Sequence, residues 1–240
     1  LLVGHIYGST IQNNTVNDST INLDYNANNS YATRIGGLIG NVNSAAATIS
    51  KCNVSGITMN NASRVAAVGG LVGNMETSAA GTTITDSSVS DANIYNKYIT
   101  NTAYSMYIGG AIGRSLEEYT ASNVDVSNVN ITATSLVNGV GCFAGYITGS
   151  AGSTIDGTNV NNSTLTITGY NDTEGYECYN VSTLIGCVDS DSTIKNCYVD
   201  TASVMTKGRT FYLGGLVGST YSDGIQETPK NGMVTIDHCY

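Results

Sequence analysis

The 240-residue sequence has one proline, no tryptophan and two histidines, and only 11% of its residues are charged. Because His5 and His238 lie at opposite ends of the chain, no central Ser-His or Cys-His catalytic pair can be assembled. No apolar run approaches the roughly 18 residues that a membrane helix needs, so we expect no membrane span in this segment. The net charge of −9 argues against a nucleic-acid partner, since no basic surface exists to neutralise phosphates.

What the sequence does contain is a five-residue glycine-rich motif, called the box below. Its copies occupy residues 36–40, 69–73, 109–113, 141–145, 182–186 and 214–218, and Leu2-Val3-Gly4 is the end of another. The last glycines of successive copies are 36, 33, 40, 32, 41 and 32 residues apart. A period of this size indicates a solenoid, a propeller or another repeat array.

Between the boxes, apolar residues recur at fixed offsets and form three columns. The first anchors are Ile11, Ile49, Ile84, Ala121, Ile155, Ile194 and Ile236. Five residues later stand Val16, Val54, Val89, Val126, Val160 and Val199. Five residues further stand Ile21, Met59, Ile94, Ile131, Leu165 and Val204. β-Branched anchors at one constant spacing, separated by Ser, Thr, Asn and Gly, predict strands in register and disfavour helices.

These columns predict an all-β fold, a parallel β-solenoid of six to seven coils with 32–42 residues per coil. A propeller is the main alternative, but its blades need antiparallel hairpins, and hairpin turn signals are sparse here. Residues 1–240 are expected to form one continuous repeat array. Because the chain opens inside one box and stops inside another repeat, we expect a segment of a longer array, or a subunit whose ends neighbours cover. The box glycines either adopt positive φ at a corner or permit close backbone approach.

The box together with Ser192-Thr193-Ile194-Lys195-Asn196-Cys197-Tyr198-Val199 resembles the GLUG-motif repeats of secreted and surface-attached proteins. The resemblance covers nearly the whole chain. It implies a β-solenoid with an adhesin-like role at the cell surface or outside the cell, and it implies no catalytic residues. Cys142 and Ser182-Thr183 depart from the pattern by replacing box glycines, which suggests local variation of the corner.

The connections that lead back to the box alternate between long and short. The long ones, residues 24–34, 97–107 and 168–180, hold half of the 16 tyrosines. These are Tyr25, Tyr31, Tyr98, Tyr104, Tyr107, Tyr170, Tyr176 and Tyr179. Tyrosine is enriched at protein interfaces, so these loops are predicted to contact partners or other copies of the chain. The alternatives are that the rings cover the edge of their own solenoid, or that they stack on sugars.

Cysteines and glycosylation sequons give weaker signals. Cys197 and Cys239 fall in one column on successive coils, where the Cα separation allows a disulfide; a buried, reduced pair is the alternative. No cysteine–histidine spacing matches a zinc site. Among the sequons, Asn28 and Asn171 lie in long loops and are the better candidates for glycosylation.

No set of residues indicates catalysis, a metal or a cofactor. The acidic clusters Glu117-Glu118, Asp189-x-Asp191 and Asp172-x-Glu174 lie in irregular connections and are interpreted as solvated surface. The expected function is therefore a non-enzymatic structural or adhesive module, extracellular or at the cell surface, that assembles with neighbouring subunits. The alternative is a carbohydrate-active or glycan-binding β-helix protein.

Overall fold

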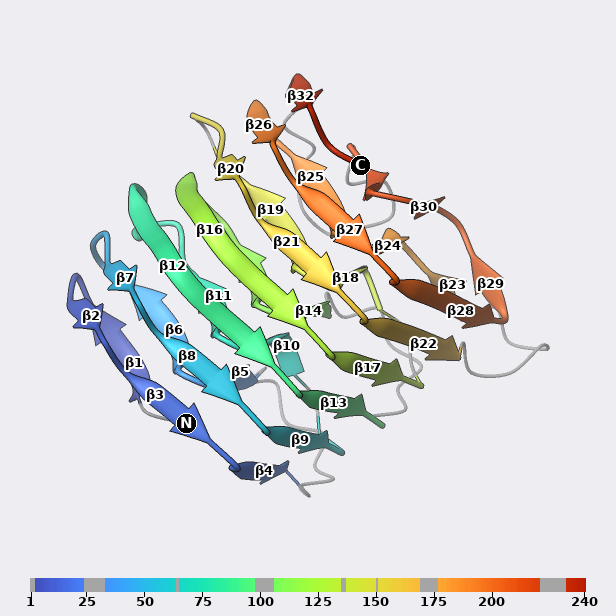
Figure 1. The fold of residues 1–240 in the computed structure, drawn as a ribbon, viewed down its shortest axis with the longest axis horizontal. Helices are drawn as coiled ribbons and strands as arrows, with labels where there is room; N and C mark the ends of the chain where they lie inside the picture. The colour runs from blue at the N-terminus through green and yellow to red at the C-terminus, as the bar shows by residue number, and fades with distance from the viewer. Residues whose placement is uncertain are drawn as a thin grey trace.

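The computed structural model describes residues 3–23, 33–63, 65–97, 106–134, 137–149, 151–168, 177–220 and 232–240. Within these ranges the regular structure consists of strands β1 to β32, and no helix is present. The described residues therefore contain no helix that could cross a membrane. The strands pair in parallel and lie side by side in rows, from β1–β4 at the N-terminal side to β26–β32 at the C-terminal side (Figure 1). The predicted parallel β-solenoid is confirmed.

Each box contributes two strands, one on either side of its central residues. The first sheet consists of β1 (Val3–Tyr7), β6 (Ile39–Asn43), β11 (Val72–Met75), β15 (Ile112–Ser115), β19 (Ala144–Thr148), β25 (Ile185–Asp189) and β31 (Val217–Ser219). The second sheet consists of β5 (Thr33–Gly36), β10 (Val65–Gly69), β14 (Tyr107–Gly109), β18 (Gly139–Gly141), β24 (Val181–Ser182) and β30 (Leu213–Gly214).

The three anchor columns form the other two large sheets. The third sheet carries the first and second anchors on β2 (Thr10–Gln12), β3 (Thr15–Asn17), β7 (Thr48–Ser50), β8 (Asn53–Ser55), β12 (Thr82–Ser90), β16 (Tyr119–Ser127), β20 (Thr154–Asp156), β21 (Asn159–Asn161), β26 (Ser192–Lys195), β27 (Tyr198–Asp200) and β32 (Val234–Asp237). The fourth sheet carries the last anchors on β4 (Thr20–Leu23), β9 (Thr58–Asn61), β13 (Asn93–Asn96), β17 (Asn130–Ala133), β22 (Thr164–Thr168) and β28 (Ser203–Lys207). A small fifth sheet pairs β23 (Glu177–Cys178) with β29 (Arg209–Thr210).

The register of the stacked coils agrees with the predicted columns. Ile84 pairs with Ile49 on one side and with Ala121 on the other, and Val126 pairs with Val89 and Val160. The described residues form five complete coils, β5–β9, β10–β13, β14–β17, β18–β22 and β24–β28, with a partial coil on each side. The prediction of six to seven coils counted these partial coils as whole ones.

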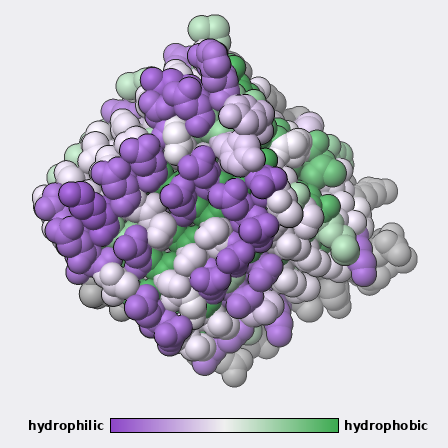
Figure 2. Space-filling view, viewed as in Figure 1, coloured by the Kyte–Doolittle hydropathy of each residue, from purple (hydrophilic) through white to green (hydrophobic). Residues whose placement is uncertain are grey.

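The apolar columns form the core. Ile49, Ile84 and Ile155 are each 0% exposed, whereas Ile236 in the same column of the last coil is 45% exposed. Full burial of one such side chain contributes roughly 1.5–3 kcal/mol, so the column is a main source of stability. On the face in view, hydrophilic residues predominate, a narrow hydrophobic band shows in the middle, and further hydrophobic surface lies on the side of the C-terminal strands (Figure 2).

Two polar corners explain the constant five-residue spacing. One corner lies two residues after the first anchor and the other lies seven residues after it. All members of both columns have left-handed backbone, with φ between 47° and 65°. They are Asn13, Lys51, Asp86, Asn123, Gly157, Asn196 and His238, then Asp18, Gly56, Asp91, Asn128, Asn162 and Thr201. Asn, Asp and Gly adopt this conformation at the lowest cost, and they fill most of these positions.

The box glycines work differently, because none of them has positive φ. A Cβ atom on Gly36 would lie 1.9 Å from the carbonyl oxygen of Ile39, and one on Gly70 would lie 2.1 Å from that of Gly110. Of the two predicted roles for these glycines, the structure selects close backbone approach.

The two departures Ser182 and Thr183 fit into the box by replacing a steric clash with a hydrogen bond. The Ser182 hydroxyl lies 2.6 Å from the carbonyl oxygen of Ile185 and 3.0 Å from that of Leu216. The Thr183 hydroxyl donates to the carbonyl oxygen of Gly215. Small hydroxylated side chains are therefore tolerated where the stacked backbones meet.

Candidate functional site

The long connections start from alternate strands of the fourth sheet, namely β4, β13 and β22. The long connections thus start along one edge of the solenoid, as the alternation of their lengths predicts. Most of the predicted loop residues themselves lie outside the described residues. These are Tyr25, Tyr31, Tyr98, Tyr104, Tyr170 and Tyr176, together with the glycosylation candidates Asn28 and Asn171.

The two remaining tyrosines of the predicted set, Tyr107 and Tyr179, have different environments. Tyr107 is 0% exposed and stacks on Tyr146, with ring centroids 4.7 Å apart. The prediction that Tyr107 projects from the edge is therefore wrong: it belongs to β14, and its ring packs inward. Tyr179 is half-buried and stacks on Phe211 of the next coil, with ring centroids 5.0 Å apart. This contact agrees with the alternative prediction, in which the rings cover the edge of their own solenoid.

Cys197 and Cys239 interact across adjacent coils as free thiols. Each Sγ lies within hydrogen-bond distance of a backbone carbonyl two residues earlier, 3.2 Å from Lys195 and 3.3 Å from Asp237. Burial is the main cause that raises the pKa of Cys197 to about 12. A disulfide between the two stays a prediction.

A buried polar ladder follows the first sheet, one residue beyond the last glycine of each box. Asn74 donates its Nδ2 to Oδ1 of Asn41 at 2.7 Å and accepts from Nε of Arg114, also at 2.7 Å. The guanidinium carbon of Arg114 lies 5.6 Å from the ring centroid of Tyr107, and the Tyr107 ring stacks on Tyr146. The chain thus holds a buried cation that donates to an amide and lies over the face of one ring of a stacked tyrosine pair.

The ladder continues to a buried carboxylate. The Tyr146 hydroxyl lies 3.4 Å from Oδ2 of Asp189, which is 0% exposed. Burial first, and then neighbouring Tyr107, Cys187 and Asp189, raise the pKa of Tyr146 far above its usual range, so this hydroxyl stays protonated. The interpretation of Asp189 as solvated surface is wrong, because it ends β25 inside the protein. The ladder was not predicted, although its residues share the column one position after the box.

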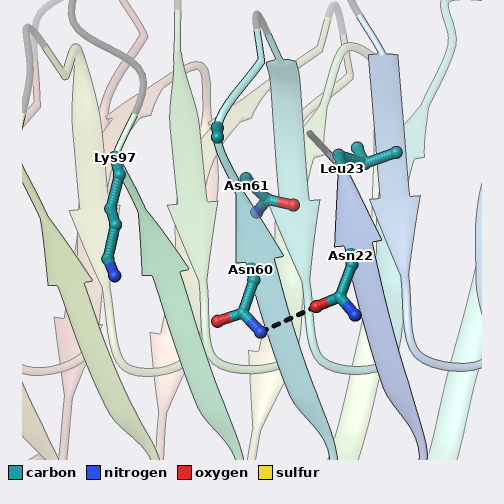
Figure 3. Close-up of a pocket in the computed structure, with 6 residues that line it drawn as sticks. Asn22, Leu23, Asn60, Asn61 and Lys97 are labelled. Atoms are coloured by element: carbon teal, nitrogen blue, oxygen red, sulfur yellow. Dashed lines mark hydrogen bonds between the residues drawn. The ribbon is translucent and has the colours of Figure 1, made fainter. Parts of the chain in front are cut away.

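A groove crosses three neighbouring strands of the fourth sheet. It has a volume of about 470 Å³ and is lined by Asn22, Leu23, Asn60, Asn61, Ala62 and Lys97. Nδ2 of Asn60 donates to Oδ1 of Asn22 at 2.8 Å, and Asn61 lies beside this pair (Figure 3). Amides, an ammonium group and two aliphatic side chains therefore meet at one place. The groove was not predicted, because its residues show no motif along the sequence.

Among the described residues, no group of three or more His, Cys, Asp or Glu side chains is placed to hold a metal ion. Glu117 and Glu118, the acidic pair predicted at the surface, are half-buried.

No protein-family model matches the chain, and no curated protein or solved structure matches it either. The resemblance to GLUG-motif repeats therefore stays a prediction that rests on the box and on residues 192–199 alone.

Proposed function

We propose that this chain is a non-enzymatic structural and adhesive module, extracellular or at the cell surface, that builds or decorates a filament. Its end faces would stack on further coils of the same kind, and its Tyr-rich connections would contact lateral neighbours. The observation that carries the proposal is the exposure of apolar side chains on the last described coil.

Apolar side chains that are buried in interior coils are exposed on the last coil. Leu213 is 57% exposed, whereas Val181, its partner on the preceding coil, is 0% exposed. Ile236 is 45% exposed, and its partner Ile194 is 0% exposed. A further coil in the same register would cover both side chains and pair with the open edges of their strands.

The spacing of the long connections supports lateral contacts. They start from every second strand of one sheet, so their pitch is twice the distance between strands, about 9.6 Å. A row of equally spaced, tyrosine-rich segments suits a repetitive partner such as a second solenoid.

Electron microscopy and size-exclusion chromatography of the purified chain test this proposal. We expect elongated assemblies that Leu213→Lys combined with Ile236→Lys converts to monomers, because two buried cations at an end face prevent stacking. Thr120→Lys, on the exposed outer face of the third sheet, should leave the assemblies intact. Capped, monodisperse monomers of the unaltered chain at all concentrations would contradict end-to-end stacking.

Lateral contact is tested separately with Tyr170→Ser combined with Tyr176→Ser. These changes should reduce bundling of the assemblies while their length is kept.

The alternative, a glycan-binding or carbohydrate-active β-helix protein, is favoured by one observation, the polar groove on the fourth sheet. Sugar release from acidic and neutral polysaccharides tests the enzymatic form of this alternative, and turnover would replace the structural proposal.

A further inference from the structure

We infer that the groove on the fourth sheet is a binding site for an acidic saccharide, a short chain of sugars that carry carboxylate groups. This inference goes beyond the proposed function, because it requires neither stacking nor lateral assembly. It rests on the side chains that line the groove and on the polar atoms they leave available.

The first observation is a buried amide without a partner. Asn61 is 1% exposed, and neither its Oδ1 nor its Nδ2 has a hydrogen-bond partner within the described part of the chain. Buried polar side chains nearly always have partners. The Asn61 side chain lies on the core-facing side of β9 with Met59, so a polar ligand group would satisfy it only by entering the groove past the end of the strand. Its neighbour Ala62, in contrast, presents only a methyl group to the groove.

The second observation is an available cation. Lys97 is exposed, and no carboxylate of the described residues forms an ion pair with it. Its Nζ lies 5.8 Å from the ring centroid of Tyr95, so the aromatic face positions the ammonium group. The ammonium group keeps its N–H donors for a carboxylate.

The third observation concerns the shape and polarity of the groove. The bond between Asn60 and Asn22 leaves Oδ1 of Asn60 and Nδ2 of Asn22 available, and that oxygen points toward the side where Lys97 lies (Figure 3). Amides that offer both an acceptor and a donor match sugar hydroxyls, which also accept and donate. Leu23 and Ala62 supply aliphatic contacts for the C–H face of a sugar ring. The volume of about 470 Å³ lies within the usual range for small-ligand sites.

Because the whole chain carries a charge of −9, an acidic ligand is repelled everywhere except near such a local cation. Binding should therefore depend on Lys97 and weaken as the salt concentration rises.

Isothermal titration calorimetry of the purified chain with trigalacturonic acid tests the inference. A neutral trisaccharide, maltotriose, and a peptide of equal charge, triglutamate, are the comparison ligands. We expect trigalacturonic acid to bind at least tenfold more tightly than either. Equal or tighter binding of triglutamate would assign the groove to acidic peptides and overturn the inference, as would the absence of any binding at millimolar concentration.

Two variants locate the binding. Lys97→Gln should weaken it at least tenfold, whereas Lys207→Gln, at the corresponding position of β28 beyond the groove, should change it less than twofold. Asn61→Leu keeps the branched shape of the side chain, although it is larger, and it removes both unsatisfied polar atoms, so it should abolish binding; circular dichroism checks that the variant is folded. Unchanged affinity in Lys97→Gln or Asn61→Leu would overturn the inference even if the chain assembles into filaments.

Discussion

At the box, the chain turns where the backbones of neighbouring coils touch, whereas at the two polar corners it turns through a single left-handed residue. A Cβ on Gly70 would lie 2.1 Å from the carbonyl oxygen of Gly110. At the corner, Asn123 has a φ of 53° and points its amide outward to Asp86 of the preceding coil. The box is therefore constrained by the space between coils, and the corner by the conformation of one residue.

The comparison explains why the two kinds of turn differ in sequence variability. Among the complete coils, the box admits only Gly, Ser, Thr and Cys at its first two positions. In the same coils, the corners admit Asn, Asp, Gly, Lys and Thr. A contact between backbones excludes nearly every side chain, while a left-handed residue costs most side chains about 1 kcal/mol.

Gly70→Ala should lower the free energy of unfolding by about 4 kcal/mol or prevent folding, because its Cβ meets backbone atoms that cannot move away. Gly215→Ala is the matched control: it occupies the same position of the last box, where a Cβ meets nothing within 4 Å. Urea denaturation followed by circular dichroism measures both. Equal effects of the two changes would mean that stacking does not constrain the box.

Cys142, which replaces a box glycine, should make stability fall at alkaline pH. Burial raises the pKa of its thiol to about 12, so the folded state keeps a proton that the unfolded state releases above about pH 9. The contribution of the Cys142 thiol to the free energy of unfolding is fully present below pH 9 and decreases as the pH rises toward 12. Between pH 8 and pH 11 the free energy of unfolding of the unaltered chain should fall by about 3 kcal/mol more than that of Cys142→Ala. Identical losses in the two proteins would contradict the burial of this thiol.

Asn128→Ala should cost about 1 kcal/mol, since Ala adopts a φ of 54° less readily and the 2.9 Å hydrogen bond to Asp91 is lost. Asn128→Gly should cost less, because Gly restores the backbone conformation and loses only the hydrogen bond. Thermal unfolding of the two variants separates these contributions. A larger cost for Gly than for Ala would show that the backbone conformation is not the main requirement at this corner.

Gly157→Asn should change stability by less than about 0.5 kcal/mol, because Asn already occupies this column at Asn123 and Asn196. Gly157→Val should cost about 1–2 kcal/mol, since a β-branched residue resists a φ of 63°. Denaturant titrations compare them, and an equal penalty for Asn and Val would contradict the account of the corner.

The sequence alone was sufficient for the fold because the solenoid repeats its constraints. Ile84 shares its column with six other anchors. One apolar residue would be a weak indication of a strand, but the same spacing repeated in every coil defines the register. The polar corners were not predicted, although the same spacing indicates them: anchors five residues apart would face opposite sides of a straight strand, so one residue between them must turn the chain.

The buried ladder and the groove were harder to predict, because both depend on contacts between residues of different types. Asn41, Arg114 and Tyr146 share one column, yet an amide, a cation and an aromatic ring show no common pattern. Lys97 and Asn22 meet in the groove only because β4, β9 and β13 are stacked. Tyr107 was misplaced since its position next to a long connection could not show that its ring packs inward.

The alternation of long and short connections also bears on how such a chain can change in length. Removing one coil that has a short connection would bring two tyrosine-rich connections onto adjacent strands and halve the separation of their starting points from about 9.6 to about 4.8 Å, whereas removing one that has a long connection would widen it. Gain or loss of coils in pairs keeps the separation unchanged. Natural length variants that arise by tandem duplication should therefore differ by even numbers of coils.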